Sequence, residues 1–295
     1  MKSTLKIYVL AALVALTFTA QAQNKPSAKK TNAGSQVLPL DPNVKTGRLA
    51  NGFTYYIRKN VEPKNRATLY LANKVGSILE NDDQQGLAHF MEHMSFNGTK
   101  NYPKNDLVGY LQKAGVRFGA DLNAYTSFDE TVYQLPIPTD DPEVFKNGMQ
   151  IMRDWAQDAT LDVDEINKER GVVLEEKRLG KGAAQRMQQQ YLPVIFNGSR
   201  YANRLPIGTE EVLKNFKPET IKSFYTDWYR PDLQALIVVG DIDVAAVEQQ
   251  IKTQFADLKK PAKAKPRTQY NIPLSGTNQF IAVTDKEFPV SVVQM

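Results

Sequence analysis

The sequence of 295 residues contains no cysteine and only two histidines. Without cysteine it has neither a disulfide framework nor a site for lipid attachment, so an exported compartment is tolerated but not required. After its N-terminal segment it has no apolar run long enough to span a bilayer. It also lacks a phosphate-binding glycine loop, a nucleic-acid module and a series of stacking aromatic residues. We therefore expect no nucleic-acid partner.

The first 22 residues have the pattern of a secretory signal peptide. Lys2 and Lys6 precede an apolar run at 7–16, and the small-residue ending Ala20-Gln-Ala22 follows. We expect cleavage before Gln23, a polar linker over residues 23–38, and a periplasmic or secreted protein without a stable membrane anchor. An uncleaved anchor is the alternative, although the apolar run is short for a spanning helix.

The two histidines stand four residues apart in the run 86–98. Four apolar residues beside them recur at i, i+3, i+4 and i+7, which predicts one buried stripe of a short helix: Leu87, Phe90, Met91 and Met94. Asp82 and Asp83 offer an N-cap, and Asn97-Gly98 offers a stop. The histidines and Glu92 then project from the opposite face and converge on one patch.

The run His89-Phe-Met-Glu92-His93 has two interpretations. One is a solvated polar face that contains two histidines by chance. The other is a zinc site, because neutral imidazoles at i and i+4 can reach one tetrahedral metal and the carboxylate between them can transfer a proton. This spacing favours zinc. Catalytic zinc normally takes a third protein ligand and leaves the fourth position to water.

A second long helix, predicted from an N-cap at Asp162 through Arg178, could supply that ligand. Glu169 and Glu176 are seven residues apart and lie nearly superposed on one face, whereas Glu175 points about 100° away. Most charged residues on a long helix are simply solvated, so this segment alone does not identify a ligand.

The two motifs together are far more specific than either one. The histidine run, followed by Glu169-Arg-Gly-Val-Val-Leu-Glu-Glu176, resembles the inverted zinc signature of the pitrilysin/insulysin (insulinase) metallopeptidases. Other matching stretches lie at 96–99, 118–127, 131–133, 206–209, 228–231 and 239–241. The resemblance covers about residues 40–260.

This resemblance implies a role for each motif residue. His89, His93 and Glu176 would bind one zinc ion per catalytic domain, with Glu175 as the less favoured third ligand. Glu92 would be the general base, which takes a proton from metal-activated water and passes it to the departing amine nitrogen. Glu169 resembles a carboxylate that orients a metal ligand, with an ordinary surface glutamate as the alternative.

The resemblance also points to a substrate site. Asn123, Ala124 and Tyr125 match a strand beside the zinc to which family members add the substrate backbone. Strand addition reads main chain more than side chain, so we expect peptides or unfolded segments as substrates. Tyr125 and Tyr133 also suit a sheet for their β propensity alone.

The remaining pattern predicts an α+β domain over residues 39–258, with helices packed on an open mixed or antiparallel sheet. Its expected elements are a hairpin at Asn51-Gly52, strands at 67–74 and 235–239, a helix from Pro142 and a closing helix at 244–255. A Lys/Pro linker follows at 259–272. Residues 273–295, with a strand expected at 279–283, look like the truncated start of a second homologous domain.

The leading hypothesis is therefore a zinc-dependent endopeptidase. In the resembled family a second half holds the substrate and stabilises the oxyanion, so we expect a second homologous half or a partner subunit. Without it, this chain would bind zinc and peptide but would not turn the peptide over. The alternative is a non-catalytic peptide-binding or scaffold subunit of a pitrilysin-like assembly, although such members are expected to lack the ligands that are present here.

Overall fold

A computed structural model describes residues 39–104, 106–116, 123–274 and 276–294. The expected signal peptide and the polar linker at 23–38 lie outside the described residues, as does the stretch 117–122. The chain divides into two units, residues 1–41 and residues 42–295. The fold below is that of the second unit.

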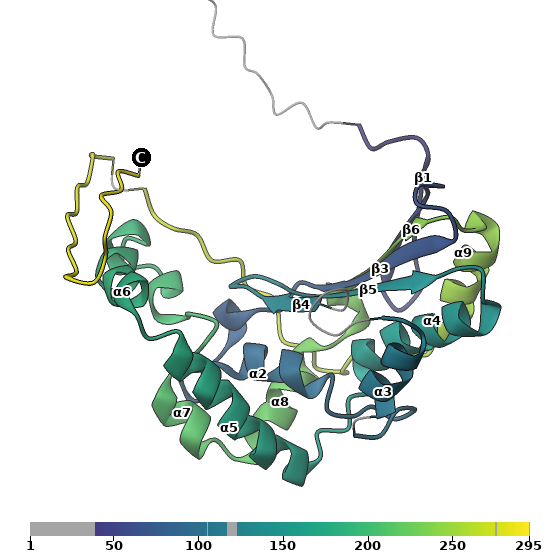
Figure 1. Cartoon of the computed structure of the whole chain (residues 1–295), viewed down its shortest axis with the longest axis horizontal. Coiled ribbons are helices and arrows are strands. Elements are labelled where there is room, and N and C mark those ends of the chain that lie inside the picture. The colour runs from purple at the N-terminus through teal and green to yellow at the C-terminus, as the bar shows by residue number, and fades with distance from the viewer. Residues whose placement is uncertain (1–38, 105, 117–122, 275, 295) are drawn as a thin grey trace, which may run out of the picture. The chain divides into compact units, whose positions relative to one another are not determined.

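A six-stranded sheet forms the centre of this unit, in the order β1-β2-β6-β3-β5-β4 (Figure 1). Only β2 and β6 pair in parallel, and the other neighbours are antiparallel. The sheet is therefore mixed, as expected, with β1 and β4 at its edges. The strand bounds are β1 Val44–Arg48, β2 Thr54–Lys59, β3 Arg66–Asn73, β4 Asn123–Thr126, β5 Thr131–Pro138 and β6 Gln234–Gly240.

Helices pack against one face of the sheet (Figure 1), which confirms the predicted α+β class. In the described ranges they are α2 Leu87–Met94, α3 Asp106–Lys113, α4 Pro142–Gln157, α5 Val163–Leu179, α6 Ala183–Ile195, α7 Glu210–Asn215, α8 Pro218–Trp228 and α9 Val244–Gln254. Short 3-10 turns connect them: η1 Ser77–Leu79, η2 Asp82–Gln84, η3 Arg200–Asn203 and η4 Pro231–Leu233. None of the helices described is long and apolar enough to cross a membrane.

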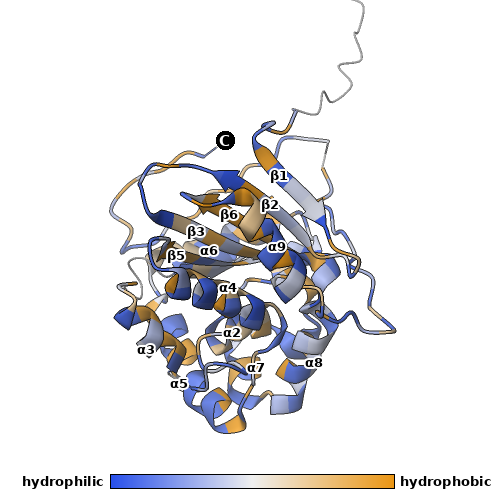
Figure 2. Ribbon diagram, turned by 90° about the vertical axis from the view of Figure 1, so that its right-hand side faces the viewer, coloured by the Kyte–Doolittle hydropathy of each residue, from blue (hydrophilic) through white to orange (hydrophobic). Residues whose placement is uncertain are grey.

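The core lies between the sheet and these helices. Along β3, β5 and β6 buried and half-buried residues alternate, because successive strand side chains point to opposite faces. Leu69, Leu71 and Tyr133 lie on the buried face, and Trp155 of α4 packs against Tyr133. Figure 2 shows hydrophobic colouring along the central strands and mostly hydrophilic colouring on α4.

Most local predictions agree with this fold. The hairpin joins β1 to β2, and Gly52 has a φ of +98°, a left-handed conformation that glycine adopts without strain. Helix α4 begins at Pro142 after the N-cap Asp141, and α9 closes the unit. On α4, Met149, Met152 and Trp155 are fully buried, whereas Val144 and Phe145 are only half-buried.

The strand predicted at 279–283 is wrong. These residues have no regular secondary structure, and Phe280 is 92% exposed. A strand needs a paired neighbour for its backbone groups, and in the described sheet this segment pairs with none. The apolar residues of this segment have β propensity, but no strand of the described sheet pairs with them.

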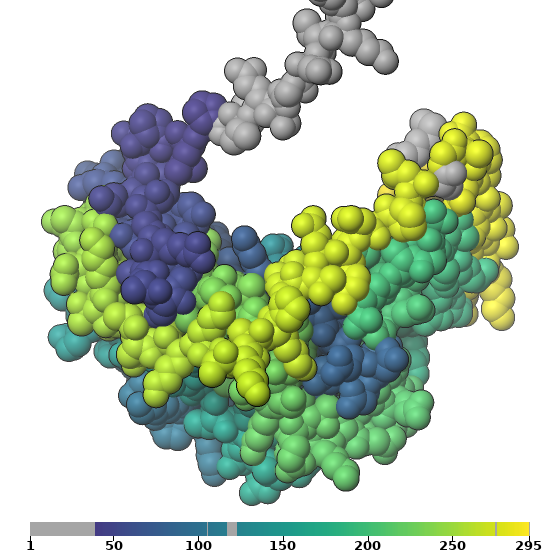
Figure 3. Space-filling view, turned by 180° about the vertical axis from the view of Figure 1, so that it is seen from behind, coloured from purple at the N-terminus to yellow at the C-terminus, as the bar shows by residue number. Residues whose placement is uncertain are grey.

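The Lys/Pro segment at 259–272 runs over the surface of the unit (Figure 3). It has no helix or strand, yet several side chains hold it in place. Lys265 pairs with Asp227 at 2.6 Å and Arg267 with Asp129 at 3.0 Å. The Arg200 guanidinium lies over the ring of Tyr270.

Candidate metal centre

The histidine helix α2 begins later than predicted. Asp82 and Asp83 lie in the separate turn η2, and the helix starts after Gly86, whose φ is +101°. The fully buried carboxylate of Glu80 accepts hydrogen bonds from the backbone N–H groups of Gly86 (3.0 Å) and Ala88 (2.8 Å). The predicted N-cap is thus wrong, because a residue outside the helix satisfies two of its free N–H donors.

Burial of Glu80 raises its pKa to about 8, against the opposing effects of the two N–H donors and of Arg204 and Arg200. This carboxyl group therefore fixes the start of α2 at a considerable desolvation cost. Asn97-Gly98 does end the segment, although the helix itself stops at Met94 and the chain passes through a turn before Gly98.

The predicted division of α2 into two faces is confirmed. Its apolar stripe is 0–1% exposed. The opposite face is largely covered rather than fully solvated, since the side chains of His89 and His93 are only 13% and 22% exposed. Glu92 between them is 8% exposed. The face of α2 that carries the two histidines and Glu92 is therefore partly enclosed by neighbouring elements.

Helix α5 brings the third candidate ligand to the histidines. Its N-cap is Asp162, as predicted, whose side chain accepts from the N–H groups of Asp164 and Glu165. Glu176 approaches the two histidines, with 3.6 Å from Oε1 to Nε2 of His89 and 3.4 Å from Oε2 to Nε2 of His93. Both contacts join residues that lie more than eighty positions apart in the sequence.

Glu175 takes a different direction, as its helical phase predicted. It is exposed and pairs with Arg178 one turn later, at 2.7 Å. Between Glu169 and Glu176, Val173 is buried in the core and Val172 is exposed. The face of α5 that meets α2 therefore carries Glu169 and Glu176, but not Glu175.

The three donor groups fit a zinc ion by both chemistry and spacing. Ligand atoms on a tetrahedral zinc at about 2.0–2.2 Å lie about 3.3–3.6 Å from one another. Here the Nε2 atoms of His89 and His93 are 3.2 Å apart, just below this range, and the contacts of the two Glu176 oxygens, one to each histidine, are 3.4 and 3.6 Å. Two imidazole nitrogens and one carboxylate form a usual catalytic zinc set.

Glu169 holds His93 from the side away from these donors. Its Oε1 accepts from Nδ1 of His93 at 2.7 Å, while its Oε2 accepts from the amide of Asn97 at 2.5 Å. A hydrogen bond at Nδ1 fixes the ring orientation and leaves Nε2 facing the other donors. The carboxylate is clamped on both oxygens, unlike an ordinary surface glutamate.

The pKa values of the two histidines are shifted in opposite directions. Burial would lower the pKa of His93, but the hydrogen bonds to Glu169 and Glu176 outweigh it and raise this pKa to about 9. Burial and the neighbouring His93 lower the pKa of His89 to about 4. Without a metal, these shifts favour the proton on His93 rather than on His89, with Nδ1 of His93 facing Glu169 and Nε2 facing Glu176.

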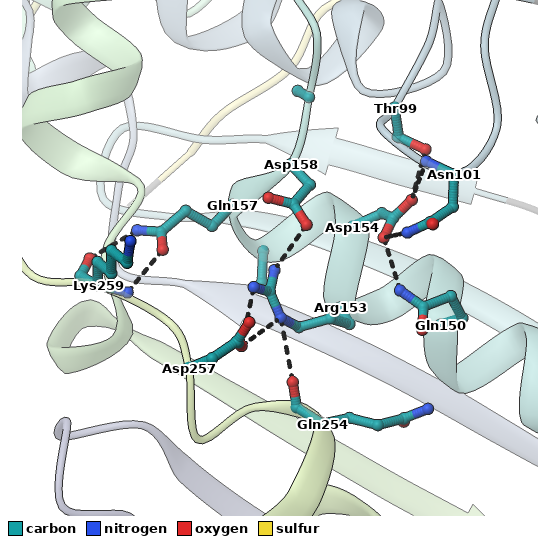
Figure 4. A network of polar contacts seen from close by, with 12 residues as sticks. Thr99, Asn101, Gln150, Arg153, Asp154, Gln157, Asp158, Gln254, Asp257 and Lys259 are labelled. Atoms are coloured by element: carbon teal, nitrogen blue, oxygen red, sulfur yellow. Dashed lines mark hydrogen bonds and ion pairs between the residues drawn. The ribbon is translucent and has the colours of Figure 1, made fainter.

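A polar network fixes the loop that carries Asn97. The buried carboxylate of Asp154 on α4 accepts from Thr99 at 2.7 Å and from the backbone and side-chain amides of Asn101 (Figure 4). The adjacent Arg153 ties α4 to Asp257 and Asp158. These contacts connect the segment after α2 to the body of the unit.

The candidate general base lies beside the edge strand β4. Burial raises the pKa of Glu92, and a hydrogen bond from Thr126 partly offsets the rise. Thr126 Oγ1 donates to Oε2 of Glu92 at 2.6 Å. Among the predicted substrate residues, Asn123 and Tyr125 are exposed and Ala124 is half-buried. The Tyr125 hydroxyl donates to Glu130, whereas Tyr133 is a core residue.

Sequence reasoning missed Glu80, Asn97 and Thr126. Glu80 follows the apolar pair Ile78-Leu79 and is fully buried, but its partners lie six and eight positions later, outside helical spacing. Asn97 was assigned only to a helix stop. Thr126 lies in the matching stretch 118–127 but was given no role, and its hydrogen bond to Glu92 depends on how β4 lies against α2.

The chain matches known proteins along most of its length. A family model described as Insulinase (Peptidase family M16) matches residues 55–204, and one described as Peptidase M16 inactive domain matches residues 215–295. The zinc protease PQQL-like of Arabidopsis thaliana is 38% identical over 250 residues, which cover 84% of this chain and 26% of that protein. The probable zinc protease PqqL of Escherichia coli (strain K12) is 37% identical over 260 residues, covering 88% and 28%.

A solved structure supports the same likeness. The crystal structure of the first half of the periplasmic protease PqqL from Escherichia coli superposes with a TM-score of 0.74 at 39% identity, and the match covers 78% of this chain and 49% of that one. This chain spans about a quarter of the length of the curated relatives it matches.

Proposed function

Because the chain belongs to the insulinase family of peptidases (peptidase family M16), we propose that it is the metal-binding half of a zinc-dependent endopeptidase. The observation that carries this proposal is the convergence of His89, His93 and Glu176 around one point, with Glu92 on the same face of α2. The relatives named as zinc proteases support it. Its substrates would be peptides or unfolded segments.

In this proposal each residue of the site has one task. His89, His93 and Glu176 hold the zinc ion, which needs His93 to give up the proton it carries in the metal-free chain. Glu169 keeps the His93 ring in place through Nδ1. Glu175 is not a ligand, since it is engaged with Arg178.

The chemistry at the scissile bond would then be general-base hydrolysis. When bound, zinc supplies Lewis-acid chemistry, because it lowers the pKa of water to about 7 and polarises a carbonyl oxygen. Glu92 removes the proton from the attacking water and delivers it to the amine nitrogen that leaves. Its raised pKa suits this task, since a base whose pKa approaches the working pH can both accept and return a proton.

The substrate would lie along β4. This strand forms one edge of the sheet, so one row of its backbone groups faces away from β5, and an extended peptide can pair there. Asn123, Ala124 and Tyr125 would contact the peptide. Because such pairing uses main-chain groups, we expect broad side-chain tolerance.

A second homologous half would complete the chamber and supply groups that stabilise the oxyanion. The longer relatives support this part of the proposal. We also propose that residues 1–22 direct export, because relatives include a periplasmic protease and the segment has the signal-peptide pattern.

The test is to measure zinc content and peptide cleavage together. The chain should bind one zinc ion, and His93→Ala should lose it. Joined to a second homologous half, the chain should cleave a fluorescence-quenched unstructured peptide, and Glu92→Gln should abolish cleavage but retain zinc. A zinc-loaded, two-half protein that cleaves no peptide would contradict the enzyme and favour a peptide-binding scaffold. A folded chain that takes up no zinc would contradict the metal site itself.

A further inference from the structure

The hydroxyl of Thr126 stands at the junction of the edge strand and the metal helix. Thr126 is the last residue of β4, and its side chain points to the same side as that of Ala124, toward the core and α2. Its Oγ1 lies 2.6 Å from Oε2 of Glu92. In the described part of the chain, this is the hydrogen bond that reaches the Glu92 carboxylate.

The direction of this hydrogen bond follows from its neighbours. Thr126 Oγ1 also lies 3.3 Å from Oγ1 of Thr131, the facing residue on β5. Thr131 is fully buried, and its hydroxyl lies 2.9 Å from the carbonyl oxygen of Val75. A carbonyl can only accept, and a hydroxyl has one proton, so Thr131 donates to Val75 and can only accept from Thr126.

The single proton of Thr126 is therefore free to go to Glu92. A carboxylate only accepts, and the 2.6 Å contact is the shorter of the two by 0.7 Å (3.3 − 2.6). The buried Thr131 keeps the Thr126 oxygen in place from behind. The hydrogen bond from Thr126 holds Oε2 of Glu92 and leaves Oε1 to interact with a proton from another group.

We propose that Thr126 is a positioning residue for the general base, which holds Oε2 of Glu92 so that Oε1 faces the reacting atoms. This inference rests on the proposed peptidase function and assigns it a residue on β4. The strand β4 provides both the edge to which a peptide would pair and the hydroxyl that orients Glu92. A peptide paired to β4 would therefore have a fixed position relative to Glu92.

The experiment compares Thr126→Val with Thr126→Ser in the zinc-loaded protein joined to its second half. Valine keeps the branched shape and the strand propensity but lacks the hydroxyl, whereas serine keeps the hydroxyl. Loss of a hydrogen bond to a charged group predicts a kcat lowered about 10- to 100-fold in the valine variant, with KM and zinc content unchanged. The serine variant should recover to within about threefold. Thr68→Val, on the strand β3, is the matched control and should retain full activity.

Crystal structures of the wild type and both variants give a second readout that does not depend on turnover. The Glu92 carboxylate should leave its position in Thr126→Val and keep it in Thr126→Ser. An unmoved carboxylate in the valine variant overturns the inference even if no peptide is cleaved, and an inactive zinc-loaded wild type contradicts the proposed function separately. Equal loss of kcat in both variants, or loss of zinc, also overturns it, since packing rather than the hydroxyl would then matter.

Discussion

Replacing Glu169 with glutamine keeps an oxygen for His93 but removes the negative charge. In the structure this carboxylate accepts from Nδ1 of His93 at 2.7 Å and from the Asn97 amide on its other oxygen. The glutamine amide keeps both contacts when the Asn97 amide turns its own oxygen toward the new NH2 group. Residues that orient a metal ligand typically contribute 10- to 100-fold to metal affinity, about 1.4–2.8 kcal/mol. We expect Glu169→Gln to lower the zinc affinity by this amount at a pH high enough that protons no longer compete with zinc for His93.

Proton competition makes the loss depend on pH. Zinc must displace the His93 proton, and a pKa of about 9 makes this cost about 3 kcal/mol at pH 7 in the wild type. Glu169→Gln lowers the pKa of His93, so zinc displaces the His93 proton more easily in the variant. At pH 7 this partly compensates for the zinc affinity that the variant loses. At pH 9, near the pKa of His93, the proton lowers the zinc affinity of the wild type only about twofold. The ratio of wild-type to variant affinity should therefore rise about tenfold or more between pH 7 and pH 9.

The assay is a competition titration with a chelator of known affinity at both pH values. Glu175→Gln is the matched control, because Glu175 lies on the same helix but is exposed and paired with Arg178. Its affinity ratio to the wild type should be close to one throughout. A Glu169→Gln ratio that is independent of pH, or that falls from pH 7 to pH 9, would refute the reasoning about His93.

Three further predictions concern the same two helices. Glu176→Gln should lose zinc by metal analysis while Glu175→Gln keeps it, because of these two residues Glu176 reaches the histidines and Glu175 pairs with Arg178; the reverse result would make Glu175 the ligand. Asn97→Leu removes the amide donor to Glu169, so zinc affinity at pH 9 should fall about tenfold, and an unchanged titration would show that the clamp is dispensable. Asp162→Ala should lower the unfolding free energy by about 1 kcal/mol through loss of the α5 cap, seen as a lower urea midpoint with an unchanged slope; an unshifted midpoint would contradict the cap.

Helical periodicity made much of the site predictable. The stripe of Leu87, Phe90, Met91 and Met94 set the phase of α2, and this phase placed the histidines on the other face. The same argument separated Glu176 from Glu175 on α5. Predictions of this kind succeed because a helix repeats every 3.6 residues whatever surrounds it.

Predictions of helix ends and of isolated strands were less successful. Asp82 and Asp83 looked like an N-cap, but Gly86 turns the chain and the buried Glu80 takes the N–H groups instead. The strand expected at 279–283 has no partner in the described sheet. In both cases the outcome depends on a contact with a distant part of the chain, which the local sequence pattern does not predict.

The sequence by itself determined which side chains share a face: His89, Glu92 and His93 on one helix, and Glu169 and Glu176 on another. Only the tertiary structure decided that these two faces meet, that Asn97 holds Glu169, and that Thr126 holds Glu92. The physical reason is that the direction of a side chain within a helix or strand follows from backbone geometry. Contacts between elements instead depend on how the whole core packs, which no short stretch of sequence encodes.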